Sequence, residues 1–82
     1  MSWEIKWKPI PLKFLESLQK DVALRILDKL KEVKENPFRY IEHYEGEYYK
    51  LRIGDYRMLI DIDFTAKFLI IEVFDKRGRI YK

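Results

Sequence analysis

The sequence contains no cysteine among its 82 residues, which excludes disulfides, cysteine-ligated metal sites and thiol catalysis together. His43 is the single histidine, and this leaves too few soft ligands for a structural zinc site. No apolar run approaches the ~20 residues of a membrane-spanning helix, and the amino end lacks the pattern of a signal peptide. We therefore expect a cytoplasmic protein without a membrane anchor, and we expect no cofactor.

The length predicts one domain that covers residues 1–82, since a typical domain takes ~100–200 residues. A chain this short buries only roughly 60% of its unfolded surface, so its core should be marginal. The net charge is small, at +3. Residues 48–82 carry all of this surplus, because residues 1–47 hold nine basic and nine acidic side chains. The basic character therefore belongs to the second half of the chain.

The first half of the chain predicts one strand followed by two helices. Apolar and polar residues alternate in residues 3–7, the period of a half-buried strand, and Pro9 and Pro11 end that strand. Pro11 also suits the first turn of a helix, and Asp21 is a plausible N-cap of a second one. The second helix should end at Asn36, before a proline. The short break between the helices predicts a two-helix hairpin.

The second half predicts three strands, which cover residues 48–53, 56–63 and 68–74. Gly54-Asp55 is a two-residue connection that suits a type II′ hairpin turn. The last strand is apolar on both faces except at Glu72, so it should lie inside the sheet. We expect an α+β fold of order β-α-α-β-β-β, with the two-helix hairpin on one face of a mainly antiparallel four-stranded sheet. The other face should be open.

Two arginines should meet on this open face. If Gly54-Asp55 is a two-residue loop, Arg52 lies directly opposite Arg57, and Lys50 lies on the same face one step along. Like charges directly opposite each other are destabilising, so the presence of this pair needs an explanation. One interpretation is a solvated face with splayed side chains. The other is an anion site, most simply for phosphate, which the planar fork of arginine matches well.

The element order, residues 49–57 (YKLRIGDYR) and the basic ending at residues 76–81 (KRGRIY) together resemble the RelE branch of the RelE/ParE toxin superfamily, the archaeal members in particular. This resemblance implies a toxin of a type II toxin–antitoxin system. RelE-type toxins cleave mRNA in the ribosomal A site without a metal. In that reaction a ribose 2′-hydroxyl attacks the adjacent phosphate and leaves a 2′,3′-cyclic phosphate.

The resemblance also assigns roles to individual residues. Arg57 and Arg77 would clamp the phosphate, while Lys50 would stabilise charge or help to activate the 2′-hydroxyl. Tyr81 would stack on a base or take part in proton transfer. Further contacts to the RNA backbone would come from Arg52, Lys76 and Arg79. Tyr48 departs from the bacterial members, which have a lysine there, so the identity of the general base stays open.

The implied partners are the ribosome, mRNA and a RelB-like antitoxin protein that wraps the toxin and covers its site. Two alternatives stay open on the same fold. One is a ParE-like poison of DNA gyrase, which has no need of Lys50, Arg57 and Arg77. The other is an inactive toxin relic that still binds RNA. His43, among acidic neighbours, is expected to be an exposed loop histidine rather than a general base.

Overall fold

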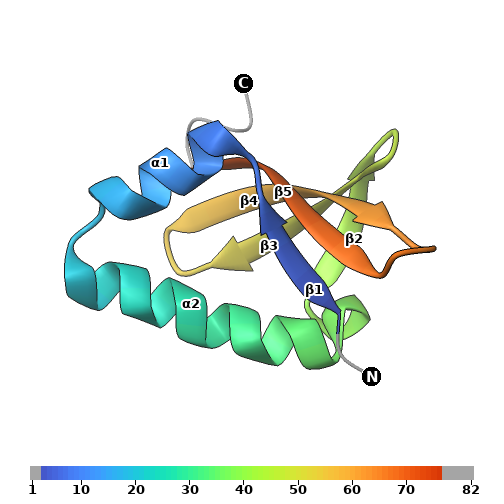
Figure 1. The fold of residues 1–82 in the computed structure, drawn as a ribbon, viewed down its shortest axis with the longest axis horizontal. Helices are drawn as coiled ribbons and strands as arrows, with labels where there is room; N and C mark the ends of the chain where they lie inside the picture. Colours follow the sequence, from blue (N-terminus) through green and yellow to red (C-terminus); the bar gives the residue numbers. More distant parts are fainter. Residues whose placement is uncertain (1–2, 77–82) are drawn as a thin grey trace.

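The computed structural model describes residues 3–76, and in this range the two helices cover one face of a five-stranded sheet (Figure 1). The elements, in chain order, are β1 (Glu4–Trp7), α1 (Pro9–Ser17), α2 (Lys20–Glu35), a 3-10 turn η1 (Pro37–Arg39), β2 (Ile41–Glu45), β3 (Tyr48–Ile53), β4 (Tyr56–Asp63) and β5 (Phe68–Lys76). The strands lie in the order β1-β5-β4-β3-β2. β1 runs parallel to β5, and every other pair is antiparallel. The α+β fold and the mainly antiparallel sheet are thus confirmed.

The helices begin and end close to the predicted positions. α1 starts at Pro9 and has Pro11 in its first turn, as predicted, because the missing N–H of a proline has no helical partner there. α2 starts at Lys20, with Gln19 as its N-cap, so the prediction of Asp21 as the N-cap was wrong. Asp21 instead lies in the first turn, where its carboxylate interacts favourably with the helix dipole.

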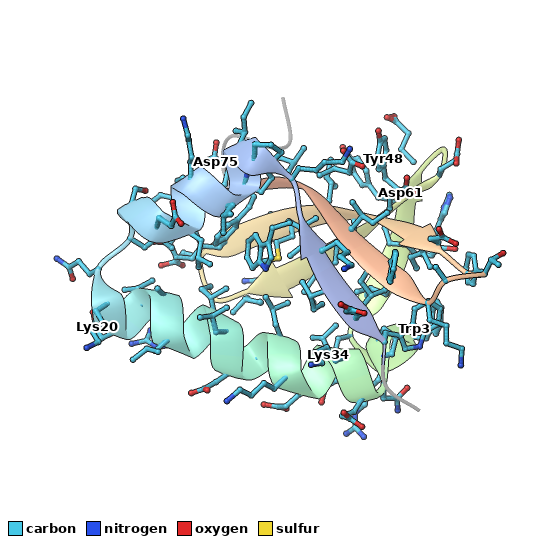
Figure 2. All side chains as sticks on the ribbon, viewed as in Figure 1. Trp3, Lys20, Lys34, Tyr48, Asp61 and Asp75 are labelled. Carbon is cyan, nitrogen blue, oxygen red and sulfur yellow. The ribbon has the colours of Figure 1, made fainter. Side chains whose placement is uncertain are left out.

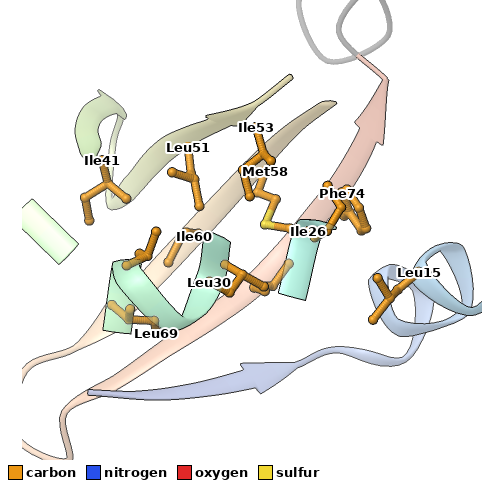
Figure 3. Close-up of a cluster of buried hydrophobic side chains, with 12 residues drawn as sticks. Leu15, Ile26, Leu30, Ile41, Leu51, Ile53, Met58, Ile60, Leu69 and Phe74 are labelled. Carbon is orange, nitrogen blue, oxygen red and sulfur yellow. The ribbon is translucent and has the colours of Figure 1, made fainter. Parts of the chain in front are cut away.

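The core lies between α2 and one face of the sheet (Figure 3). Ile26, Leu30 and Val33 recur at helical spacing and form the buried stripe of α2. The sheet contributes a second group of buried side chains, which are Ile41, Leu51, Ile53, Met58, Ile60, Leu69, Ile71 and Phe74. α1 adds Leu15 and lies against β5. Both helices therefore use the same side of the sheet, and neither of them covers the other side.

The sheet has one strand more than the four expected. β2 pairs with β3 at one edge, with Ile41 opposite Leu51 and His43 opposite Tyr49. Its sequence (IEHYE) escaped prediction because Ile41 is its one fully buried side chain and glutamate is poor in strands. Edge strands tolerate such charges, which also block pairing with other chains. His43 is exposed as expected, but it lies on this strand rather than in a loop.

The β4–β5 turn is held by a side chain and strained at a single residue. Asp63 accepts hydrogen bonds from the backbone N–H groups of Thr65 and Ala66, at 3.1 and 3.0 Å. Lys67, which completes the turn, has a φ of 61°. This is the left-handed region, in which the Cβ of an L-residue crowds the following carbonyl.

We expect Lys67→Gly to stabilise the protein by about 0.5–1 kcal/mol, since glycine adopts this φ without the steric penalty. The gain should appear as a rise in Tm in thermal unfolding followed by circular dichroism. Lys67→Ala is the matched control, because it removes the ammonium group 5.8 Å from the Trp3 ring but keeps the strain. A lower Tm for the glycine variant would contradict the prediction.

Candidate functional site

The open face of the sheet is organised as parallel rows of side chains, because directly paired residues of neighbouring strands share a face. The first row runs across three strands as Arg52, Arg57 and Asp75. The second contains Lys50, Leu59 and Val73, with Glu42 of β2 opposite Lys50. The third contains Tyr48, Asp61 and Ile70. Figure 2 shows Tyr48 and Asp61 close together and Asp75 apart from them, toward α1.

The two arginines face each other as predicted. Gly54 has a φ of 58°, and the two-residue loop that it forms with Asp55 leaves Ile53 opposite Tyr56 and Arg52 opposite Arg57. The arginines differ in exposure, since Arg52 is exposed while Arg57 is only 7% exposed. A guanidinium group held at the sheet surface with little freedom loses little side-chain entropy when it binds an anion. Arg57 is therefore the better organised of the two for this role.

A hollow of about 150 Å³ lies at the arginine pair, and it is lined by Tyr40, Glu42, Lys50, Arg52 and Arg57. The Oε1 atom of Glu42 is 3.3 Å from the Nζ atom of Lys50. Lys50 is two-thirds buried, and its Nζ atom also lies 5.9 Å from the centre of the Tyr44 ring. Three cations from two adjacent strands thus converge on a volume that suits a small anion such as a phosphate group.

The remaining predicted residues lie elsewhere or outside the described range. Lys76 is the last residue of β5, where it pairs with Tyr56, so its register position is on the helix-covered face of the sheet. Arg77, Arg79 and Tyr81 lie outside the described residues. The described part of the predicted site therefore consists of Lys50, Arg52 and Arg57, and all three lie on one face.

Two acidic residues of the site were missed by the sequence reasoning. Glu42 belongs to the unexpected strand β2, and without that strand nothing placed it beside Lys50. Asp75 lies opposite Arg57 and completes the first row. Its position follows from a β-bulge on β5, where Leu59 pairs with Val73 and Ile60 with Ile71. Simple alternation along β5 would have given the wrong face to every residue after the bulge.

The repulsion between the two cross-strand arginines should have a measurable effect on stability. Arg52→Glu should raise the free energy of unfolding by up to about 1 kcal/mol, because an unlike pair replaces a like pair. The gain should shrink in high salt, which screens exposed charges. Urea unfolding at low and high salt measures both effects. Arg39→Glu makes the same charge change at an exposed position outside the sheet and should show no such gain.

Within residues 3–76, no three acidic or histidine side chains gather closely enough to hold a metal ion. Among these same residues, neither helix combines the length and the hydropathy needed to cross a bilayer.

Two helices on one face of a mainly antiparallel sheet, with Lys50, Arg52 and Arg57 together on the other face, define a small α+β protein. A family model for the ParE toxin of the type II toxin–antitoxin system parDE matches residues 5–80. The chain therefore belongs to this family of toxins, within the RelE/ParE superfamily. A comparison with curated protein sequences finds no match.

Solved toxin structures share the fold over almost their whole length. The archaeal RelE–RelB complex from Pyrococcus horikoshii OT3 matches with a TM-score of 0.77 at 25% identity, covering 96% of this chain and 99% of that one. The RelBE2 toxin–antitoxin complex from Mycobacterium tuberculosis matches with a TM-score of 0.83 at 17% identity, covering 94% and 100%. The isolated RelE toxin from E. coli matches with a TM-score of 0.77 at 19% identity, covering 98% and 89%.

Proposed function

We propose that this toxin is a RelE-type endoribonuclease that cleaves mRNA in the ribosomal A site and so inhibits translation. The observation that carries the proposal is the pair Arg52 and Arg57, joined by Lys50 around one hollow on the open face. Arg57 is buried between Arg52 and Asp75 in the first row, so a guanidinium group with little freedom lies directly beside a second one. A phosphate group in the hollow would offset the repulsion between the two arginines.

The proposed reaction needs a cationic site more than any other feature. The 2′-hydroxyl oxygen bonds to phosphorus as the bond to the 5′-oxygen breaks, and negative charge builds on the five-coordinate phosphate. Arg57 and Arg52 would stabilise that charge, with Arg77 as a second arm of the clamp. Lys50 would stabilise charge or assist the 2′-hydroxyl, and Tyr81 would stack on a base or move a proton. Arg79 would contact the RNA backbone beyond the hollow, whereas the register of β5 places Lys76 on the opposite face of the sheet.

The proposal includes a RelB-like antitoxin as the partner that silences the toxin in the cytoplasm. The Pyrococcus horikoshii RelE is in complex with a RelB, and it shares 25% identity with this chain. An exposed cationic face on a small domain with a marginal core also favours an acidic, stabilising partner. The segment that covers the site should place carboxylates near Arg52 and Arg57.

The test is to map mRNA ends in a translation extract after adding the folded toxin. We expect new ends within ribosome-bound codons, with 2′,3′-cyclic phosphates upstream and 5′-hydroxyl groups downstream of each cut. Naked mRNA in the same buffer should stay intact. Cleavage that is absent with folded protein present would reject the endonuclease, and salt-sensitive RNA binding in its place would indicate an inactive relic.

A ParE-like gyrase poison is the second candidate, because the family model that matches the chain is that of the ParE toxin. This function does not require a phosphate clamp. It predicts inhibition of DNA gyrase in a supercoiling assay and an unchanged effect when Lys50 or Arg57 is replaced. If the protein is instead an endoribonuclease, gyrase should keep its full activity and the DNA should stay intact at the same toxin concentration.

A further inference from the structure

An apolar strip borders the cationic row on the open face. Leu59 is half-buried and lies opposite Val73, which is 38% exposed, and Ile70 lies in the next row. The β-bulge on β5 creates this strip, because it makes Glu72 the extra residue and brings Val73 opposite Leu59. The Glu72 carboxylate instead lies 4.0 Å from the Lys8 ammonium group. The bulge thus places an aliphatic side chain where strict alternation would have placed a carboxylate.

The spacing of the rows fits a single nucleotide. Arg57 and Leu59 are two residues apart on β4, so their rows are separated by roughly 7 Å along the strands. The sugar of a nucleotide holds its base away from its phosphate by a similar distance. A phosphate in the arginine hollow would therefore place the attached base over Leu59 and Val73. Apolar surface of this kind accepts the flat face of an unpaired base.

The third row lies where the outer edge of that base would reach. Asp61 is half-exposed and lies opposite Tyr48, which is 41% exposed, on the side of the strip away from the arginines. A carboxylate accepts hydrogen bonds from the amino groups of adenine, cytosine and guanine. Uracil has no amino group, and its single N3–H donor lies between two carbonyl oxygens that a carboxylate repels.

We infer that Leu59 and Val73 form a seat for one unpaired RNA base beside the arginine hollow, and that Asp61 selects bases with an amino group over uracil. The inference rests on the proposed RNA substrate and deepens it, because it gives the open face a base preference. Tyr48 lines the far end of the seat, which gives this aromatic side chain a use at the position where the bacterial members have a lysine. The seat and the hollow together hold one nucleotide.

The test is fluorescence anisotropy with labelled heptamers of 2′-O-methyl adenosine, cytidine and uridine, whose blocked hydroxyl prevents cleavage. We expect the uridine heptamer to bind about tenfold more weakly than the other two. Asp61→Asn should reduce this preference to less than about twofold, because an amide can also donate to uracil. Glu47→Gln makes the same charge change in the exposed β2–β3 turn and should keep the preference.

Val73→Thr provides a second, nearly isosteric probe that stays compatible with a strand. It should weaken all three heptamers by about threefold to tenfold, since it puts a hydroxyl under the base. Equal wild-type binding of the three heptamers, or no binding at all, would overturn the seat, as would full affinity in Val73→Thr. Base-dependent binding without mRNA cleavage would retain the seat and reject the endonuclease, whereas cleavage without base preference would do the reverse.

Discussion

Replacing Arg57 by alanine should lower the rate of A-site mRNA cleavage about 10²–10³-fold, the usual effect of removing one preorganised charge stabiliser. Arg57 is the buried member of the cross-strand pair, and it lines the hollow with Arg52 and Lys50. Its guanidinium group can donate two parallel hydrogen bonds to phosphate oxygens, while the neighbouring cations hold the negative charge in place. The loss should appear in the rate of the chemical step under saturating ribosomes rather than in ribosome binding.

Arg57→Lys should recover only part of the lost rate. A lysine restores the charge but not the planar fork, so it cannot reproduce a two-point contact. Lys13→Ala removes one positive charge from the exposed face of α1 and serves as the control. It should cleave like the wild type if local geometry, rather than net charge, is what matters.

Because Arg57 is buried, its replacement by alanine could unfold the protein, so the test also needs a variant that keeps the packing of the side chain. Arg57→Met retains most of the unbranched stem and loses the charge, so its fold should survive better than that of the alanine variant. Circular dichroism and the urea midpoint establish whether each variant is folded. A folded Arg57→Met variant that cleaves at the wild-type rate would remove Arg57 from the mechanism, whatever the alanine variant does.

The hairpin that carries the site could be predicted because its information is local. A two-residue loop with glycine first allows one register, and that register fixes which residues of β3 and β4 share a face. The opposition of Arg52 and Arg57 followed from this alone. The second helix could also be predicted, since its apolar residues Ile26, Leu30 and Val33 recur at helical spacing.

The missed features depend on partners distant in the sequence. β2 is a strand only because β3 offers it an edge, and its acidic composition gives no local sign of pairing. The bulge at Glu72 is likewise set by packing, which needs both Ile71 and Phe74 in the core although they are three residues apart. An odd spacing cannot keep two residues on one face without an extra residue between them. The positions of Glu42, Asp75 and Val73 on the open face therefore could not be predicted from the sequence.

Replacing Ile60 by alanine should have the largest effect on stability. Ile60 is completely buried on β4, the central strand (Figure 3). It lies opposite Ile71, which is equally buried. Removing a buried isoleucine side chain costs about 2–5 kcal/mol, from the lost burial and the cavity that is left. At about 0.05–0.15 kcal/mol per residue, the whole domain should be stable by only some 4–12 kcal/mol.

The cost of Ile60→Ala is a large part of the total stability of the domain. A loss of about 3 kcal/mol would take a quarter or more of the total stability and lower Tm by roughly 10–25 °C. Ile10→Ala is the matched control, because Ile10 is 81% exposed on α1 and its loss should change stability by less than about 0.5 kcal/mol. Urea unfolding of both variants measures the difference, and a cost below about 1 kcal/mol for Ile60→Ala would mean that the core can close around the cavity. Since Ile60 lies between Leu59 and Asp61 on β4, such a collapse should also weaken the base preference, which the heptamer assay would report.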